Sequence, residues 1–460
     1  MRQLLLSVVS GRASAVQARY HHRHHLRLRV ENGRVTRLSA SEKEGVAIRV
    51  LQKGVWGFAS TCRLSPGELK KTFEEASQAA LCGAGLKPEF PLATTPARGH
   101  LAVREREPLS SIPLEAKLAL LRKTDERMRH LSPKIVSTVT GYEEIIDEKI
   151  IVTSYGSDVS YRDVKADFQA LAFAADGARL EYGRVSLGAT GGWSELFRHT
   201  KEEAIPELAV SSALEKVAAQ PAPAGVFTVV LHPSLVGILA HEAIGHTVEA
   251  DFVLSGSIAS KFLGQKIAAE TITLVDDPLP QVDPAASGVV LVDDEGNHPI
   301  RATIIEQGYL KGYLHNAETA GIFKVANTGN ARAFTYQDEP LIRMRNTYIL
   351  PGNLEPEEII AETPSGLYLK GLGQSGQADA NAEFMFGVDE AWLIEKGKLT
   401  RRVTGVTISG QAFAVLSSVD KVGCDLLLNS GAGYCGKHQP AKVDAGGPHL
   451  RCRLKVGGNR

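Results

Sequence analysis

The stretch from Leu239 to Asp251, which reads LAHEAIGHTVEAD, constrains this chain more than any other. His241 and Glu242 are adjacent, and His246 follows, so that two imidazoles and a carboxylate lie within six residues. Zinc hydrolases use histidine to hold their metal and glutamate to assist its chemistry. The stretch therefore predicts a metal site, and the alternative is a pair of buried histidines on an apolar helix.

The spacing of the two histidines bears directly on that prediction. In the familiar zinc motif H-E-x-x-H the histidines are four residues apart on one helix face, whereas His241 and His246 are five apart. Side chains five residues apart differ by roughly 140° around an ideal α-helix, so both could not reach one ion. A π-bulge absorbs one extra residue, and Gly245 removes a steric obstacle to such a distortion. We therefore predict a π-bulge at this point.

A catalytic zinc site takes three protein ligands and keeps one position for water, so a third ligand is needed. The sequence offers Cys435, Glu249 and His315. Glycines on both sides of Cys435 would let the backbone approach an ion closely, which favours the cysteine. Glu249 could instead accept a hydrogen bond from the imidazole N–H of His246, a contact that zinc-bound histidines nearly always make. The residues alone leave this choice open.

Composition gives no support to several classes of protein. Lysine plus arginine and aspartate plus glutamate number 52 each, so the net charge is zero and no nucleic-acid partner is expected. Five cysteines are an odd, sparse set for a large chain, which favours a reducing, cytoplasmic location. The apolar run at residues 3–9 is interpreted as an amphipathic helix rather than a secretory signal. No run approaches the roughly 18 apolar residues of a membrane span, so no membrane association is expected.

The chain of 460 residues has the length of about three domains. A connection rich in proline and glycine, from Pro88 to Pro113, and a stiff linker at 221–225 mark the boundaries. We predict an N-terminal α+β domain at 1–100, a central α+β domain at 101–222 and a C-terminal domain at 223–460 that contains the metal motif. The fold class is α+β: the first two domains mix helices with antiparallel strands, and the larger third domain is β-rich and carries the metal-motif helix.

Local patterns in the first half predict several elements. Residues 26–59 alternate as a β-meander, with Asn32-Gly33 as a type I′ hairpin turn. The histidine cluster at 21–25 is interpreted as a solvated strand or helix end rather than a metal site. A helix is expected from Ser65, its capping residue, to Gly83. Further helices are expected at 114–131 and at 195–219, the latter bent at Pro206.

In the second half, residues 226–231 read as a buried strand, and Pro233 opens the helix of the metal motif. The pairs Asp276-Asp277 and Asp293-Asp294 could be read as paired acids or a divalent-metal site. They are better interpreted as turn residues, because each pair stands close before proline or glycine. Glycine-rich strands are expected between residues 367 and 408, and an extended peptide could pair with an exposed strand edge in this region.

Longer motifs carry a resemblance to a known family. They are HEAIGHTVEADF from His241, LVDDP from Leu274, LVDDEG from Leu291, TGNARA from Thr328, LIRMRNTYILPG from Leu341, LIEKGKL from Leu393, GYCGK ending at Lys437, and, more weakly, GVAIRVLQKGVWGFAS from Gly45. In this order they resemble the TldD/PmbA family of cytosolic metallopeptidases, and in particular its catalytic, TldD-like branch. The resemblance covers nearly the whole chain.

The resemblance implies roles for particular residues. The family pattern H-E-x-x-x-H plus a late cysteine falls on His241, His246 and Cys435 as zinc ligands, with Glu242 as the general base. It also implies cleavage of short or unfolded peptides in an enclosed chamber, formed as a homodimer or as a heterodimer with a related, non-catalytic subunit. The chain departs from the family pattern at Ala250 and after Lys437, and neither departure touches an expected ligand.

The expected function is therefore zinc-dependent peptide hydrolysis, in which Glu242 takes a proton from a zinc-bound water. An alternative is a peptide-binding or modulator protein whose zinc is structural and is closed by four protein ligands. A regulator of DNA gyrase that touches DNA would need a basic surface, and the balanced charge supplies no sign of one.

Overall fold

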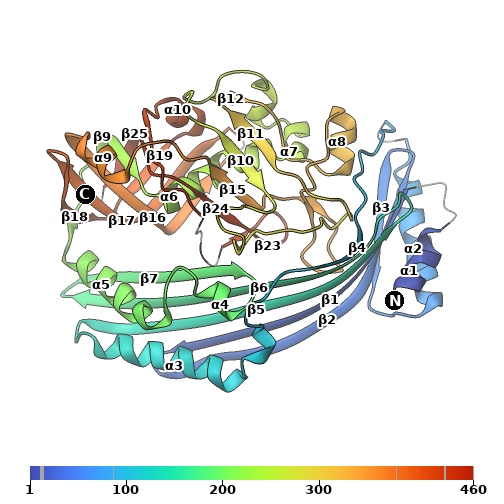
Figure 1. The fold of residues 1–460 in the computed structure, drawn as a ribbon, viewed down its shortest axis with the longest axis horizontal. Helices are drawn as coiled ribbons and strands as arrows, with labels where there is room; N and C mark the ends of the chain where they lie inside the picture. The colour runs from blue at the N-terminus through green and yellow to red at the C-terminus, as the bar shows by residue number, and fades with distance from the viewer. Residues whose placement is uncertain (11–14, 86–87, 380, 429–430, 432, 459–460) are drawn as a thin grey trace.

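The computed structural model describes residues 1–10, 15–85, 88–379, 381–428, 431 and 433–458. A long curved sheet runs along one side of the molecule, and the C-terminal half lies on its concave side (Figure 1). The predicted α+β class, with antiparallel strands first and a larger β-rich part after them, is confirmed.

The long sheet joins strands from both of the first two predicted domains. Its order is β3-β2-β1-β5-β6-β4, with β7 also paired to β6. The strands are β1 Ala15–Glu31, β2 Arg34–Gln52, β3 Val55–Thr61, β4 Arg98–Ala102, β5 Ile135–Thr153, β6 Asp158–Asp176 and β7 Arg179–Thr190. The antiparallel pairing of β1 with β5 runs from Gln17 opposite Thr153 to Glu31 opposite Val139. Residues 1–100 and 101–222 thus share a sheet, and their division into domains stays a prediction.

The hairpin between β1 and β2 forms as its sequence predicts. Asn32 and Gly33 have φ angles of 48° and 81°, and positive φ at both central residues is what a type I′ turn requires. The turn pairs Glu31 with Arg34, and a bulge between Arg29 and Val30 then shifts the register by one residue, so that Leu28 lies opposite Leu38 and Ala18 opposite Ile48. Ala18 and Ile48, which lie far from the turn, are buried in an apolar core.

Helices flank the long sheet. They are α1 Arg2–Val9, α2 Pro66–Cys82, α3 Leu114–His130, α4 Trp193–Leu196 and α5 Ile205–Ala218, with short 3-10 turns η1 Leu109–Ser111 and η2 Glu202–Ala204. The expected amphipathic helix at the start is present as α1, which buries Leu5, Val8 and Val9. In α2 the side chain of Ser65 accepts from the Glu68 amide, which confirms its role as the cap.

Two local predictions in this half are wrong. The expected helix at 195–219 is interrupted, because α4 ends at Leu196 and α5 begins at Ile205, with Pro206 in its first turn. The amide N–H groups of the first turn have no acceptor within the helix, so a proline there, which has no N–H, loses no hydrogen bond. Pro206 is therefore found at the start of a helix and does not bend one. The histidine cluster lies in mid-strand on β1, where His21 is 1% exposed and 2.9 Å from Asp147, so it is not a solvated end.

The C-terminal half contains two larger sheets. One has the order β16-β9-β25-β19-β17-β18-β8, and the other β12-β11-β10-β15-β24-β21. Their strands are β8 Gln220–Pro221, β9 Gly225–Leu231, β16 Ser365–Ala378, β17 Glu383–Glu395, β18 Lys398–Thr404, β19 Thr407–Gln411 and β25 Leu450–Gly457, then β10 Leu274–Asp277, β11 Ala302–Glu306, β12 Tyr309–Leu310, β15 Asn346–Ile349, β21 Leu427–Leu428 and β24 Asp444–Gly447. The expected strand at 226–231 is present as β9 and is buried at residues 229–231, but Val226 at its start is exposed; the glycine-rich strands after residue 367 are confirmed.

Short elements complete this half. They are the strand pairs β13 Ala331–Arg332 with β14 Leu341–Ile342 and β22 Tyr434–Cys435 with β23 Ala441–Lys442, the strand β20 Lys421–Val422 on β25, and the helices α6 Pro233–Ile238, α7 Ala250–Leu254, η5 Ile258–Lys261, α8 Ala317–Phe323, α9 Pro356–Ala361 and α10 Ala412–Ser417. Among the described helices, none combines the length and the apolar character that crossing a bilayer requires.

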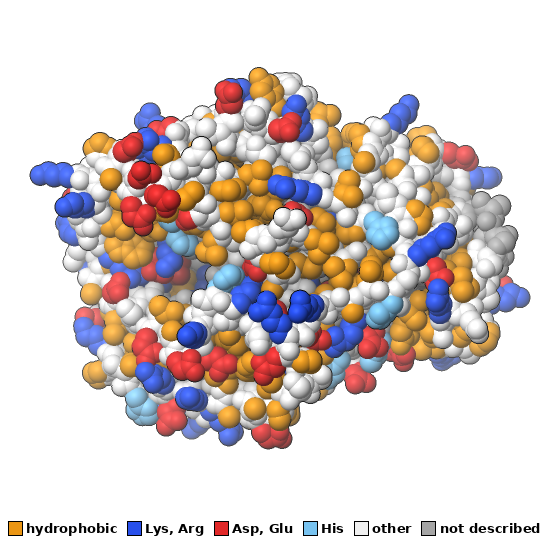
Figure 2. Space-filling model, viewed as in Figure 1, with side chains coloured by type: hydrophobic (Ala, Val, Ile, Leu, Met, Phe, Trp, Pro, Cys, Tyr) orange, Lys and Arg blue, Asp and Glu red, His pale blue; other side chains and the backbone are white. Residues whose placement is uncertain are grey.

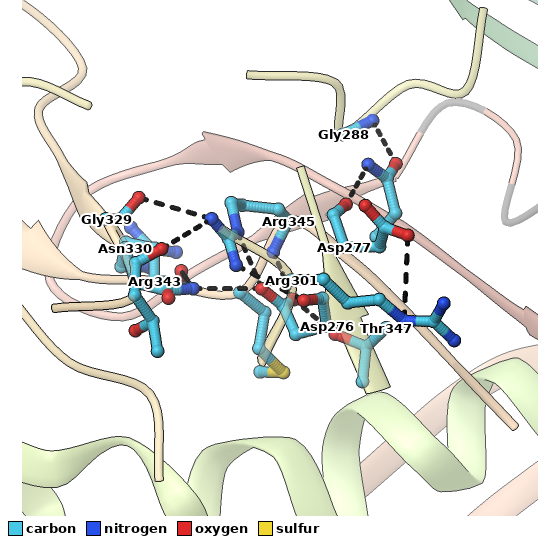
Figure 3. Close-up of polar contacts among 12 residues, drawn as sticks. Asp276, Asp277, Gly288, Arg301, Gly329, Asn330, Arg343, Arg345 and Thr347 are labelled. Atoms are coloured by element: carbon cyan, nitrogen blue, oxygen red, sulfur yellow. Dashed lines mark hydrogen bonds and ion pairs between the residues drawn. The ribbon is translucent and has the colours of Figure 1, made fainter. Parts of the chain in front are cut away.

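In the first aspartate pair only Asp277 is a turn residue, because its carboxylate accepts from the backbone amide of Leu279 at 3.0 Å, whereas Asp276 lies within a strand. Asp276 and Asp277 end strand β10, and Asp276 is fully buried. Its carboxylate accepts from Arg345 Nε at 2.6 Å, from Asn330 Nδ2 at 3.0 Å and from Thr347 Oγ1 at 3.0 Å (Figure 3). A buried charge needs such partners, and they come from residues more than 50 positions away, which no local pattern reveals.

The second aspartate pair does form a turn. Asp293 accepts from the backbone amides of Glu295 at 3.0 Å and Asn297 at 2.7 Å, as an Asx turn requires. Asp294, which follows, is buried and pairs with Lys149 of β5 at 2.9 Å. The turn therefore also ties the C-terminal half to the long sheet.

Candidate metal centre

The two histidines of the motif lie on a distorted helix. After α6, residues Leu239–Ile244 form a π-helical turn (η3), and Gly245–Val248 form a tighter 3-10 turn (η4). The predicted π-bulge is thus confirmed. The wider turn absorbs the extra residue between the histidines and brings the rings of His241 and His246 to 5.3 Å between centroids.

Gly245 contributes to this turn in a way that the sequence did not predict. Its φ of −54° is an ordinary helical value, so no unusual backbone conformation requires glycine here. A Cβ at this position would lie 2.0 Å from Met344 Sδ. Glycine is therefore needed because Met344 packs directly against the turn.

The third candidate ligand comes from the far end of the chain. Cys435 lies on β22, and its Sγ is 3.4 Å from His246 Nε2 across 189 positions of sequence. Donor atoms of His241, His246 and Cys435 all lie within 4.8 Å of one another. Two imidazole nitrogens and a thiolate at this spacing are a donor set that suits zinc.

The chemistry of these side chains fits a metal. His241 is 4% exposed, and neither of its ring nitrogens has a hydrogen-bond partner among the described residues. A buried polar group without a partner is costly, and a metal would satisfy it. Burial opposes ionisation of the Cys435 thiol, but the hydrogen bond with His246 and the charges of the two neighbouring imidazoles outweigh it and lower its pKa to about 3. The thiolate is the form that binds metal.

Glu249 orients one of the histidines. Its buried carboxylate lies 2.9 Å from His246 Nδ1, which leaves Nε2 of that ring on the side of Cys435. Lys437 in turn lies 3.3 Å from Glu249 and donates to Asp251 at 2.6 Å. Glu249 therefore sits where an acceptor for a ligating histidine is expected, outside the group of three donors.

The other alternative, His315, lies elsewhere. It is buried, its Nδ1 is 3.1 Å from Thr319 Oγ1, and its ring packs against Tyr313 and Phe323. Burial lowers the pKa of His315 to about 4. Among the described residues, His315 does not belong to the group of donors that His241, His246 and Cys435 form.

Glu242, the expected base, is placed between two clefts. Its side chain is 38% exposed, and a carboxylate oxygen lies 3.8 Å from His246 Nε2. One cleft of about 580 Å³ lies between the long sheet with α5 and the strands β16–β18, and it reaches His241 and Glu242. Figure 2 shows the surface hollowed between these two parts of the molecule. A second cleft of about 580 Å³ holds Glu242, His246, Phe252 and Lys437.

Sequence reasoning missed the groups that hold the Cys435 strand in place. The fully buried Arg343 donates from Nη2 to the carbonyl of Cys435 and from Nη1 to the carbonyl of Gln439. Lys437 anchors the residues after Cys435 through Asp251. Arg343 and Lys437 lie within the motifs LIRMRN and GYCGK. The residues next to them in sequence do not indicate which carbonyls or carboxylates the two side chains contact.

Comparison with known proteins defines the class to which this fold and site belong. Three family models match the chain: PmbA/TldA metallopeptidase domain 1 at residues 16–80, the central domain at 107–217 and the C-terminal domain at 224–458. A protein named Metalloprotease from Methanothermobacter thermautotrophicus is 34% identical over 434 residues, which cover 93% of this chain and 92% of the relative. The chain belongs to the TldD/PmbA metallopeptidase family.

More distant relatives agree with this assignment. A protein of Saccharolobus solfataricus named Zinc metalloprotease TldD homolog is 29% identical, with 90% of each chain covered. The crystal structure of a Thermotoga maritima protein described as a modulator of a DNA gyrase has a TM-score of 0.79 at 22% identity, with 99% of each chain covered. TldE from Thermococcus kodakarensis has a TM-score of 0.76 at 19% identity and covers 99% of this chain and 98% of its own. These two structures show the same fold.

Proposed function

We propose that this chain is a zinc-dependent peptidase that hydrolyses short or unfolded peptides. The observation that carries the proposal is the convergence of His241, His246 and Cys435 on one point beside the exposed carboxylate of Glu242. These three side chains would hold the metal. When bound there, zinc supplies Lewis acidity, which makes a water molecule a stronger acid and polarises a carbonyl group.

The chain's own residues then have separate roles. Glu242 accepts a proton from the attacking water and passes it to the leaving amine, because its carboxylate is the exposed acid nearest the three donors. Glu249 holds the ring of His246 in one orientation through Nδ1. Arg343 fixes the main chain at Cys435, so the thiolate keeps its position relative to the histidines.

The two clefts support a peptide as the substrate. Glu242 lines both of them, so a chain could extend on either side of the reacting bond. Both clefts have polar and apolar walls: Trp392 and Leu372 lie in one, and Phe252 and Asp379 in the other. Such walls suit an extended peptide better than a single small ligand.

A structural metal, which would make the chain a binding or modulator protein, is less well supported. Structural zinc sites are closed by four protein ligands, whereas the described residues bring together three. The chamber and the subunit partner expected from the family resemblance also belong to the proposal. The relative named TldE is a natural candidate for the kind of chain that would complete such an assembly.

The proposal is tested by metal removal and return. The purified chain, alone and together with any co-purifying relative, should cleave an unstructured peptide whose ends carry a fluorophore and a quencher. A chelator should abolish cleavage, and one equivalent of zinc should restore it. A stably folded protein of similar composition serves as the control substrate and should remain intact. Peptide cleavage that persists in the metal-free protein would overturn the proposal.

A further inference from the structure

A separate cavity, about 40 Å³ in volume, lies behind the strand pair that carries Cys435. Strands β1, β5 and β6 of the long sheet form one wall, and β13, β22 and β23 contribute to the other. The charged residues around it include five cations, Arg23, Lys149, Lys165, Arg332 and Lys442, and three carboxylates, Asp147, Asp163 and Asp294. The proposed function uses none of them.

The carboxylates in the cavity wall are already paired. Asp147 accepts from Arg23 Nε and Nη2 at 2.7 Å each. Asp294 accepts from Lys149 at 2.9 Å. Asp163 lies 3.2 Å from the ammonium group of Lys165.

Of the five cations around the cavity, Arg332 is the one without a carboxylate partner among the described residues. Lys442 pairs with Asp167, which lies outside the cavity wall. Arg332 donates from Nη1 to the main-chain carbonyls of Lys442 and Met344, and it makes no ion pair with a carboxylate in the described part of the chain. Arg19, which is 3% exposed, adds a further positive charge, because it shares Asp294 at 3.5 Å with Lys149. The surroundings of the cavity are therefore positively charged overall, and a buried excess of charge is costly unless it is neutralised.

A donor atom at the cavity also lacks an acceptor. Arg23 is 6% exposed, and its Nη1, which is not used by Asp147, has no hydrogen-bond partner among the described residues. The hydroxyl of Tyr161, which is 4% exposed, interacts with Asp163, whose Oδ1 likewise has no other hydrogen-bond partner among the described residues. Burial lowers the pKa of Lys165 to about 8, and the charges of Arg332 and Lys442 add to this effect against that of Asp163. A free donor and excess positive charge both call for an anion.

We propose that this cavity binds one small inorganic anion of the size of chloride, held between Arg23 and Arg332. The volume equals the room of about three water molecules, so a peptide, a nucleotide or a large organic acid does not fit. The anion would receive charge-assisted hydrogen bonds from the unused Arg23 Nη1 and from the guanidinium of Arg332. It would also balance the positive charge that the wall carboxylates leave uncompensated.

The anion would steady the strand that carries Cys435. Lys442 lies opposite Tyr434, and Ala441 lies opposite Cys435, in the pairing of β22 with β23. Arg332 binds the carbonyl of Lys442, while Arg23 belongs to the long sheet. An anion between the two arginines thus links the cysteine-bearing strand pair to the sheet. The binding site itself does not depend on the proposed peptidase activity.

Two measurements on the full chain test the proposal. In crystals soaked in bromide, anomalous scattering should show one bromide within hydrogen-bond distance of Arg23 and Arg332. In solution at constant ionic strength, replacing gluconate, which is too large for the cavity, by chloride should raise the melting temperature by roughly 1–3 °C in a saturable way. Arg332→Gln should abolish this rise.

Arg451→Gln is the matched control, because Arg451 also donates to a main-chain carbonyl but pairs with the exposed Asp420. That variant should keep the full response to chloride. Should Arg332→Gln not fold, the bromide map and the chloride titration of the unaltered chain still decide the question. Ordered water in place of bromide, or equal melting temperatures in chloride and gluconate, would overturn the proposal.

Discussion

Glu242→Gln should lower peptidase activity by roughly 100- to 10,000-fold, the usual contribution of a positioned general base, while one zinc per chain is retained. The amide has nearly the shape of the carboxylate but cannot take a proton from water at neutral pH. The three donor atoms do not include Glu242, so metal binding should survive. Peptide cleavage and zinc content of the same preparation provide the measurement.

Glu306→Gln is a suitable control for this experiment. Glu306 lies at the end of β11, is largely exposed, lies 3.7 Å from Lys311 and lines neither cleft. This control variant should keep full activity and full zinc content. If Glu242→Gln cleaves peptide as fast as the control does, another residue is the base.

Arg345→Met should lower the free energy of unfolding by about 3–5 kcal/mol, because it removes one partner of a fully buried ion pair. Asp276 and Arg345 are both 0% exposed and lie in direct contact (Figure 3). Arg345 also donates to the carbonyls of Thr328 and Ile300. Methionine fills similar space but leaves the Asp276 carboxylate buried without its cation. Urea unfolding followed by circular dichroism measures the loss.

Arg301→Met provides the comparison for this variant. Arg301 is 45% exposed and lies 3.8 Å from Asp277, so its loss should cost less than about 1 kcal/mol. The double variant with Arg345→Met and Asp276→Leu should recover part of the lost free energy of unfolding, because it contains no buried charge without a partner at this site. Equal costs for Arg345→Met and Arg301→Met would show that the buried pair does not stabilise this sheet.

Local sequence patterns predicted the elements whose determinants are local. The turn at Asn32-Gly33 requires positive φ at both residues, and asparagine and glycine are residue types that adopt positive φ readily. The cap of α2 needs only Ser65 and the amide of Glu68. The π-turn could be predicted because the five-residue spacing of His241 and His246 leaves an ideal helix unable to bring both to one point.

Patterns failed where the partner lies far away in sequence. His21 is buried because β5 brings Asp147 beside it, and Asp276 can be buried within a strand because Arg345 neutralises it. The residues next to His21 or Asp276 in sequence do not indicate either contact. For the same reason local patterns left the third donor open among Cys435, Glu249 and His315; only the family resemblance indicated Cys435, which the fold brings to the histidines.

X-ray absorption at the zinc edge of the metal-loaded chain tests the central claim most directly. We predict two nitrogen donors and one sulfur donor from the protein, from His241, His246 and Cys435, together with one oxygen donor from solvent. A zinc ion closed by four protein donors, or one without sulfur, would contradict the account.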